Sequence, residues 1–142
     1  MIELKTKQLV LILLTIFFVM IMITTIIFYK TQVYETRIIY TDIEIINKNV
    51  IGFNIDTDAL HFGKMIPGNT GTRTMIITND YYPTTLVKIN SFGETKKWLS
   101  INPNNFVLEN GEKKEVHFTM NLEKQAPIGN FSGGVKVILL KK

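Results

Sequence analysis

The sequence predicts an all-β domain, built as an antiparallel sandwich of seven to eight strands and preceded by one transmembrane α-helix. The helix is predicted by Leu9–Phe28, a run of about twenty residues without a charge, Gly or Pro. The strands are predicted by short runs of alternating apolar and polar residues, which recur from Arg37 onward with turn residues between them. No later segment carries a helical repeat long enough for a crossover helix, so parallel βαβ architecture is excluded.

The apolar run has the length that a membrane span requires. At about 1.5 Å per residue, about twenty helical residues cover about 30 Å, the thickness of the hydrocarbon core of a bilayer. A cleaved signal peptide needs a shorter apolar region followed by small residues, whereas the first Gly, Ala and Ser here are Gly52, Ala59 and Ser91. A type IV pilin-like subunit needs a small residue before its helix, where Gln8 stands. We therefore expect a permanent membrane anchor.

Charge and composition divide the chain into four segments, and they exclude some classes of partner and of chemistry. A short polar tail over 1–8 precedes the transmembrane helix over 9–29, a juxtamembrane collar over 30–36 and one domain over 37–142. The net charge of +4 comes from Lys and Arg beside the helix and at the end of the chain. No basic surface for nucleic acid is therefore expected. The absence of Cys excludes disulfides, thiol chemistry and a lipid-modified Cys.

The strands are indicated by period-two alternation. It is clearest over Val116–Leu122, where every second residue is apolar, as a half-buried antiparallel strand requires. Trp98 and Phe118 are the large aromatic residues expected in the core. Two antiparallel sheets packed face to face close a core of this size most readily, and a closed barrel is the competing solution. The other expected strands are Ile39–Ile45, Ile51–Ile55, Leu60–Phe62, Thr72–Thr78, Val87–Ile89, Trp98–Ile101 and Phe131–Leu139, while Phe106–Leu108 leads into the following turn.

Turn residues separate these strands. Gly63–Gly71 is expected to form one loop, built on Pro67 and Gly68. Asn110 and Gly111 supply the positive φ angles that a tight hairpin needs. The sequence therefore predicts a loop before the strand Thr72–Thr78 and a hairpin turn before the strand Val116–Leu122.

A set of turn and strand residues follows one another in a characteristic order between Leu60 and Leu140. The set is Leu60, Phe62, Gly63, Pro67, Gly68, Met75–Asn79, Trp98, Leu99, Ile101, Phe106, Leu108, Gly111, Glu112, Pro127, Gly129, Phe131, Gly133 and Val135. This order resembles the immunoglobulin-like domains of the major sperm protein and Hydin type. The resemblance implies an immunoglobulin-like sandwich that acts as a binding or scaffolding module without catalytic residues, and it supplies no ligand-contacting positions. Thr36–Thr57 is less typical of the family and is expected to add an edge strand.

Candidate catalytic or metal-binding histidines are few. His61 and His117 each stand between core residues of a strand, so both side chains are expected on the polar, solvated face. More than fifty residues separate the two, and no carboxylate stands at a ligand spacing from either. We therefore expect neither a metal site nor a catalytic base.

Two further patterns lack residues that a ligand-binding loop needs. Asp42, Glu44, Asp56 and Asp58 offer oxygen ligands, but Asp56-Thr57-Asp58 lacks the Gly and the distal Glu of a calcium loop and is expected to be a turn. Gly68–Arg73 lacks the Lys of a phosphate-binding loop and opens no helix, so a hairpin-type loop is expected there. The sequence predicts no catalytic, cofactor-binding or metal-binding residues, no cofactor and no enzymatic activity.

A glycosylation sequence and the charges beside the helix bear on which side of the membrane the domain lies. Asn130 begins an acceptor sequence for N-glycosylation, Asn130-Phe131-Ser132. Charge does not decide the orientation, because the lysines before the helix are balanced by Lys30 and Arg37 after it. A short tail beside an uncleaved signal-like helix usually stays inside. The C-terminal domain is therefore expected on the extracellular side of the cell membrane.

The expected function is that of a single-pass, non-catalytic structural or protein-interaction module at the cell envelope. Its expected partners are the lipid bilayer and another protein, an envelope component or a membrane complex, with no nucleic acid and no small-molecule substrate. The alternative is an accessory subunit of a larger membrane complex, held mainly through its transmembrane helix.

Overall fold

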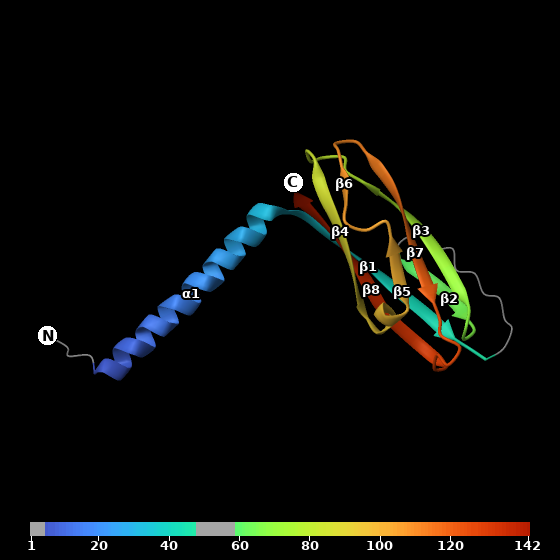
Figure 1. Cartoon of the computed structure of the whole chain (residues 1–142), viewed down its shortest axis with the longest axis horizontal. Helices are drawn as coiled ribbons and strands as arrows, with labels where there is room; N and C mark the ends of the chain where they lie inside the picture. The colour runs from blue at the N-terminus through green and yellow to red at the C-terminus, as the bar shows by residue number, and fades with distance from the viewer. Residues whose placement is uncertain (1–4, 48–58) are drawn as a thin grey trace. The chain divides into compact units, whose positions relative to one another are not determined.

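The computed structural model of the chain describes residues 5–47 and 59–142 and divides at Val33 into two compact units (Figure 1). The first unit contains one helix, α1 (Thr6–Gln32). All of its residues are exposed, and its mean hydropathy reaches 3.0 over its most apolar window. It is long and apolar enough to cross a membrane. The helix extends beyond the predicted 9–29 at both ends, because helical hydrogen bonding continues into the polar flanks.

The second unit is a domain of two β-sheets, as predicted. Among the described residues it has eight strands and one short 3-10 helix, η1 (Glu94–Lys97). The larger sheet, called sheet A, has the order β2-β1-β8-β4-β6, and sheet B has the order β3-β7-β5. The strands are β1 (Val33–Ile45), β2 (Leu60–Met65), β3 (Thr70–Thr78), β4 (Thr85–Gly93), β5 (Leu99–Asn102), β6 (Phe106–Leu108), β7 (Lys113–Asn121) and β8 (Gly129–Lys141).

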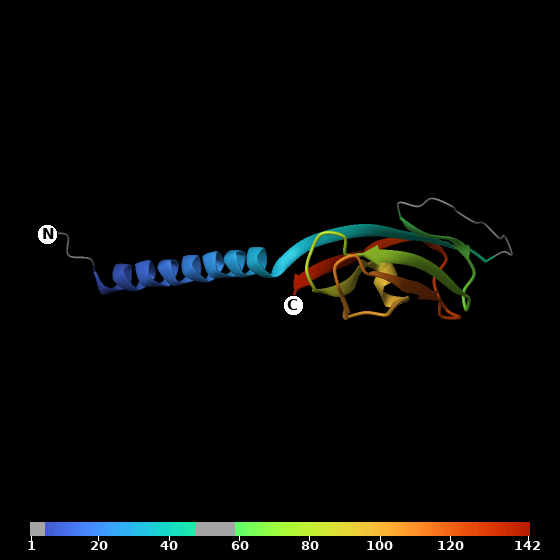
Figure 2. The ribbon, with the colours of Figure 1, turned by 90° about the horizontal axis from the view of Figure 1, so that it is seen from above.

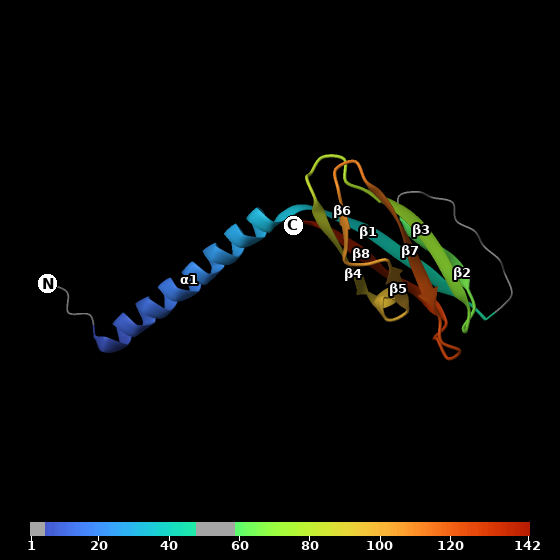
Figure 3. The same cartoon turned by 45° about the horizontal axis from the view of Figure 1, so that its top comes forward.

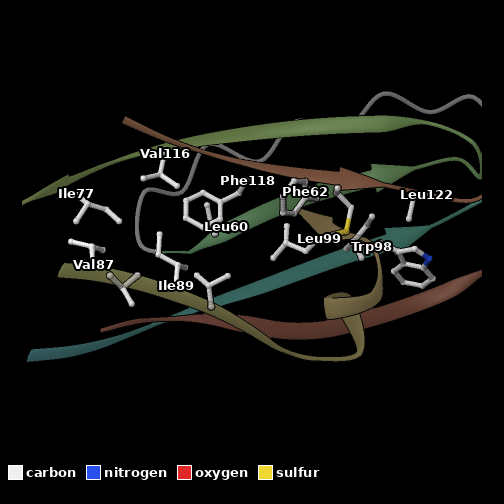
Figure 4. Packing of buried hydrophobic residues seen from close by; sticks show 14 of the residues in the cluster. Leu60, Phe62, Ile77, Val87, Ile89, Trp98, Leu99, Val116, Phe118 and Leu122 are labelled. Atoms are coloured by element: carbon white, nitrogen blue, oxygen red, sulfur yellow. The ribbon is translucent and has the colours of Figure 1, made fainter. Parts of the chain in front are cut away.

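The two sheets enclose one hydrophobic core. Side chains from β3 and β7 face side chains from β4 across it, as Ile77 and Val116 do with Val87 in Figure 4. Phe118 is fully buried and Trp98 is 4% exposed, which confirms both as core residues. The Trp98 and Phe131 rings meet edge to face with centroids 5.0 Å apart. Alternation along the strands thus places one face of each sheet in the core.

Strand β1 begins four residues before the predicted start of the domain. The predicted collar over 30–36 is divided between the end of α1 and the first residues of β1. Figure 2 shows β1 as a long curved strand within sheet A. Buried Thr41, Ile43 and Ile45 confirm the alternation predicted over Ile39–Ile45. The early start follows from strand pairing, because β8 runs back along β1 as far as Lys141, whose Nζ lies 5.3 Å from the Tyr34 ring centroid.

The prediction that every strand pair is antiparallel is wrong at β1 and β2. These strands run parallel, with Thr41 opposite Leu60 and Asp42 opposite His61. A parallel pair needs a connection of about a dozen residues or more, and residues 46–59 provide one. The strand predicted at Ile51–Ile55 lies outside the described residues.

Two predicted hairpins are also wrong. β2 and β3 belong to different sheets, as do β6 and β7, so each turn between them connects the two sheets instead of closing a hairpin. The first turn is shorter than predicted, because the strands extend to Met65 and resume at Thr70. Gly111 has the predicted positive φ, +78°, and its N–H donates to the carbonyl of Asn79. Sheet B itself is regular, and β3 and β7 lie side by side in Figures 1 and 3.

Candidate functional site

A groove of about 490 Å³ lies on the outer face of sheet A. Four segments build it: the middle of β1, the start of β2, the turn from β4 into η1, and the start of β8. Thr41 points into the core, so its neighbours on β1 point outward, as alternation requires. The residues lining the groove are Tyr40, Thr41, Asp42, His61, Phe92, Gly93, Glu94, Ser132 and Gly133.

A His–Asp pair forms one side of this groove. Asp42 and His61 stand directly opposite each other in the parallel pair of β1 and β2. The Nδ1 atom of His61 lies 2.7 and 2.8 Å from the two carboxylate oxygens of Asp42. The side chain of His61 is 22% exposed and that of Asp42 is 55% exposed. Arg73 Nε donates to the carbonyl of His61 at 2.7 Å, so β3 also holds this part of β2 in place.

Two aromatic rings form the apolar part of the groove. Tyr40 is 67% exposed and Phe92 is 40% exposed. Phe92 stands opposite Gly134 in the pair of β4 and β8. A Cβ added at Gly134 would lie 2.5 Å from Cζ of Phe92, so only glycine lets this ring lie across β8. The sheet thus presents a partly open aromatic surface next to the His–Asp pair.

Close backbone approach shapes the far side of the groove. A Cβ at Gly93 would lie 2.5 Å from Cα of Gly133, and one at Gly133 would lie 2.2 Å from Oγ1 of Thr95. Thr95 is buried and its hydroxyl lies 2.8 Å from that of Thr41. Glu94, the first residue of η1, accepts from the N–H of Ser132 at 3.4 Å. This packing fixes η1, and with it Glu94, beside β1 and β8.

The electrostatic character of the groove is acidic. Two carboxylates and one imidazole line it, and none of the described lining residues is Lys or Arg. No group of three or more His, Asp or Glu that fits a metal ion is present within 5–47 and 59–142. The arrangement offers hydrogen-bond acceptors beside aromatic faces, which suits the binding of a polar or cationic group.

The two histidines lie apart, on different sheets. The sequence interpretation placed both on solvated faces, and His117 lies on the exposed face of sheet B, where its Nδ1 is 3.1 Å from Oγ1 of Thr74. His61 is only partly exposed and is paired with Asp42, a contact that sequence reasoning missed. Strand alternation places His61 outward, but nothing in the sequence indicates that β1 and β2 pair in parallel and bring Asp42 opposite.

The other predicted positions are dispersed. Glu44 pairs with Lys64 at 3.3 Å, while Asp56 and Asp58 lie outside the described residues. Asn130 is exposed and is the second residue of β8. Its glycosylation stays a prediction. Within the part of the chain that the structure describes, the groove is one place where titratable and aromatic side chains from several strands meet.

In comparisons with protein-family profiles, with curated proteins and with solved structures, nothing matches this chain.

Proposed function

We propose that this chain is a single-pass membrane protein whose immunoglobulin-like domain, of the major sperm protein and Hydin type, binds another protein at the outer face of the cell envelope. It acts as a structural or interaction module without catalysis. The observation that carries the proposal is the exposure of α1: its apolar residues are all accessible, although the domain encloses a core of its own.

The exposed apolar helix is best explained by a bilayer. Leu, Ile, Phe and Val each favour the centre of a membrane helix by roughly 0.3 to 0.6 kcal/mol, and they make up most of Leu9–Phe28. The three threonines of this run do not oppose insertion, because their hydroxyls donate to carbonyls of the same helix. In water the same surface would promote aggregation.

The immunoglobulin-like assignment is supported by the positions of the residues that carry the resemblance. Leu60, Phe62 and Leu108 are buried, and Gly63 and Gly111 have positive φ angles. A module of two packed sheets offers edge strands, whose unpaired backbone groups can pair with a strand of a partner. Among the described strands, β3 is the longest edge strand of either sheet, and it carries one charged residue, Arg73, so its own side chains oppose such pairing little.

The second candidate function is that of an accessory subunit held in a larger membrane complex through its helix. One observation favours it: β1 begins at Val33, immediately after α1 ends at Gln32, so no linker extends the reach of the domain. The helix surface argues against it. Packed membrane helices favour the small residues Gly, Ala, Ser and Thr at their contacts, and Leu9–Phe28 contains only Thr among these four.

Two measurements test the proposal. Protease treatment of intact cells should digest the domain and leave the helix protected, and digestion only after lysis would place the domain inside. Capture of partners from gently solubilised membranes should survive exchange of Leu9–Phe28 for an unrelated transmembrane helix. Loss of the partner on that exchange would establish the accessory-subunit function instead.

A further inference from the structure

We propose that the groove on the outer face of sheet A binds an arginine side chain presented by the partner protein. This inference rests on the proposed function for the existence of a protein partner, and it adds where and by what chemistry the partner is recognised. Three properties of the groove support it: exposed aromatic faces, an available carboxylate, and the absence of a competing cation among its described lining residues.

The aromatic faces suit a guanidinium group. Tyr40 and Phe92 are 67% and 40% exposed, although burial of such rings is normally favourable. A planar guanidinium stacks on an aromatic face and is more weakly hydrated than an ammonium, so it loses less on leaving water. The aliphatic stem of the same side chain would cover the remaining apolar lining.

The carboxylate of Glu94 provides the charged contact. Its polar contact among the described residues is the backbone N–H of Ser132, at the long distance of 3.4 Å. One carboxylate oxygen and most lone pairs therefore stay available for a bidentate pair with an arginine. Asp42 is already engaged by His61 and adds negative charge at the other side of the groove.

The cations on or beside these elements have contacts of their own. Arg73 donates to the backbone carbonyl of His61, and Lys96 of η1 lines a different hollow. Lys64 pairs with Glu44 at 3.3 Å. Lys97 lies over the Trp98 ring with its Nζ 4.0 Å from the centroid, and that ring belongs to the core. The groove is thus an acidic region on a chain of net charge +4, and charge complementarity selects a basic partner group.

The test uses the full chain, labelled with ¹⁵N, in detergent micelles. The probe is the peptide acetyl-Gly-Ser-Arg-Ser-Gly-amide, and its control carries citrulline, a neutral isostere, in place of Arg. We expect the Arg peptide to shift the amide resonances of Tyr40, His61 and Glu94, and the citrulline peptide to bind about tenfold more weakly, since a charge-assisted pair is lost. Equal binding of both peptides, or shifts only outside the groove, would overturn the proposal.

Matched variants separate the groove from the general charge of the protein. Glu94→Gln should weaken binding of the Arg peptide about tenfold, whereas Glu115→Gln, on the exposed face of sheet B, should leave it unchanged. Tyr40→Leu, at a position that contributes little to the core, should weaken it severalfold while the remaining spectrum is preserved. Equal effects of the two Glu variants, or tighter binding of tetramethylammonium or an oligosaccharide than of the Arg peptide, would refute the arginine site.

The two proposals fail in distinguishable ways. If a partner is captured from membranes but the peptide does not bind the groove, the arginine site is refuted and the proposed function stands. If the peptide binds as expected and Glu94→Gln also releases the captured partner, the arginine site is supported as the recognition surface. Release by Glu115→Gln alone would place the basic contact of the partner on the exposed face of sheet B and refute the site.

Discussion

At the scale of single residues, burial separates the side chains that hold the domain from those that face water. Phe118 is fully buried between the sheets, while His117, its neighbour on β7, is exposed. Phe118→Ala and Trp98→Ala should each lower the free energy of unfolding by about 3 to 5 kcal/mol. His117→Ala should cost less than about 1 kcal/mol, because its bond to Thr74 lies on the surface. Denaturant titration measures all three, and a large loss for His117→Ala would contradict the surface assignment.

Glycine at position 133 is required by crowding. A Cβ there would lie 2.2 Å from the hydroxyl of Thr95 and 2.5 Å from the carbonyl of Phe92. Gly133→Ala should therefore force β8, η1 and β1 apart and destabilise the domain by about 1 to 3 kcal/mol.

Gly71→Ala is the matched control in another strand. Its nearest neighbours would be the terminal atoms of Met65, 3.2 and 3.3 Å away, which a flexible side chain can move aside. Thermal unfolding compares the two variants. Equal losses in both would mean that crowding at Gly133 is relieved in solution.

At the scale of elements, one edge of β3 has no partner among the described strands, and this open edge leads to a prediction about association. Proline at Gly71 and proline at Thr72 each remove one N–H, and in an antiparallel pair neighbouring N–H groups point to opposite sides. One of the two variants therefore spares the ladder with β7 and should keep the fold, while it blocks strand addition at the open edge. We expect that variant to capture less partner from membranes than His117→Ala does. Undiminished capture would show that the partner does not pair with this edge.

The sequence predicts those elements whose pattern is local. Alternation over Ile39–Ile45 and Val116–Leu122 identifies strands and their buried faces, because a side chain's face depends only on its place in the strand. The partner of a strand is a long-range property. The parallel register of β1 and β2 depends on where residues 46–59 carry the chain, so neither this register nor the Asp42–His61 pair follows from local patterns. The contact of the Phe92 ring with Gly134 cannot be predicted from local patterns either, since those residues are far apart in the chain.

At the scale of the whole molecule, the two compact units meet at Val33, and each has its own source of stability. α1 satisfies its backbone within itself, as a membrane helix must. The buried hydrophobic residues of the described chain all belong to the second unit, from Ile43 to Leu139. The fold of the second unit should therefore not depend on the membrane location that α1 provides.

A chain that begins at Val33 should accordingly fold without a membrane. It retains every buried core residue and all eight described strands, and it loses only the exposed apolar surface of α1. We expect it to be soluble, with a sheet-rich circular dichroism spectrum, while the full chain floats with lipid vesicles and the shortened chain does not. A random-coil or strongly helical spectrum would refute the independence of the domain. Flotation of the shortened chain would show that the domain itself binds lipid, because α1 would then no longer account for membrane attachment.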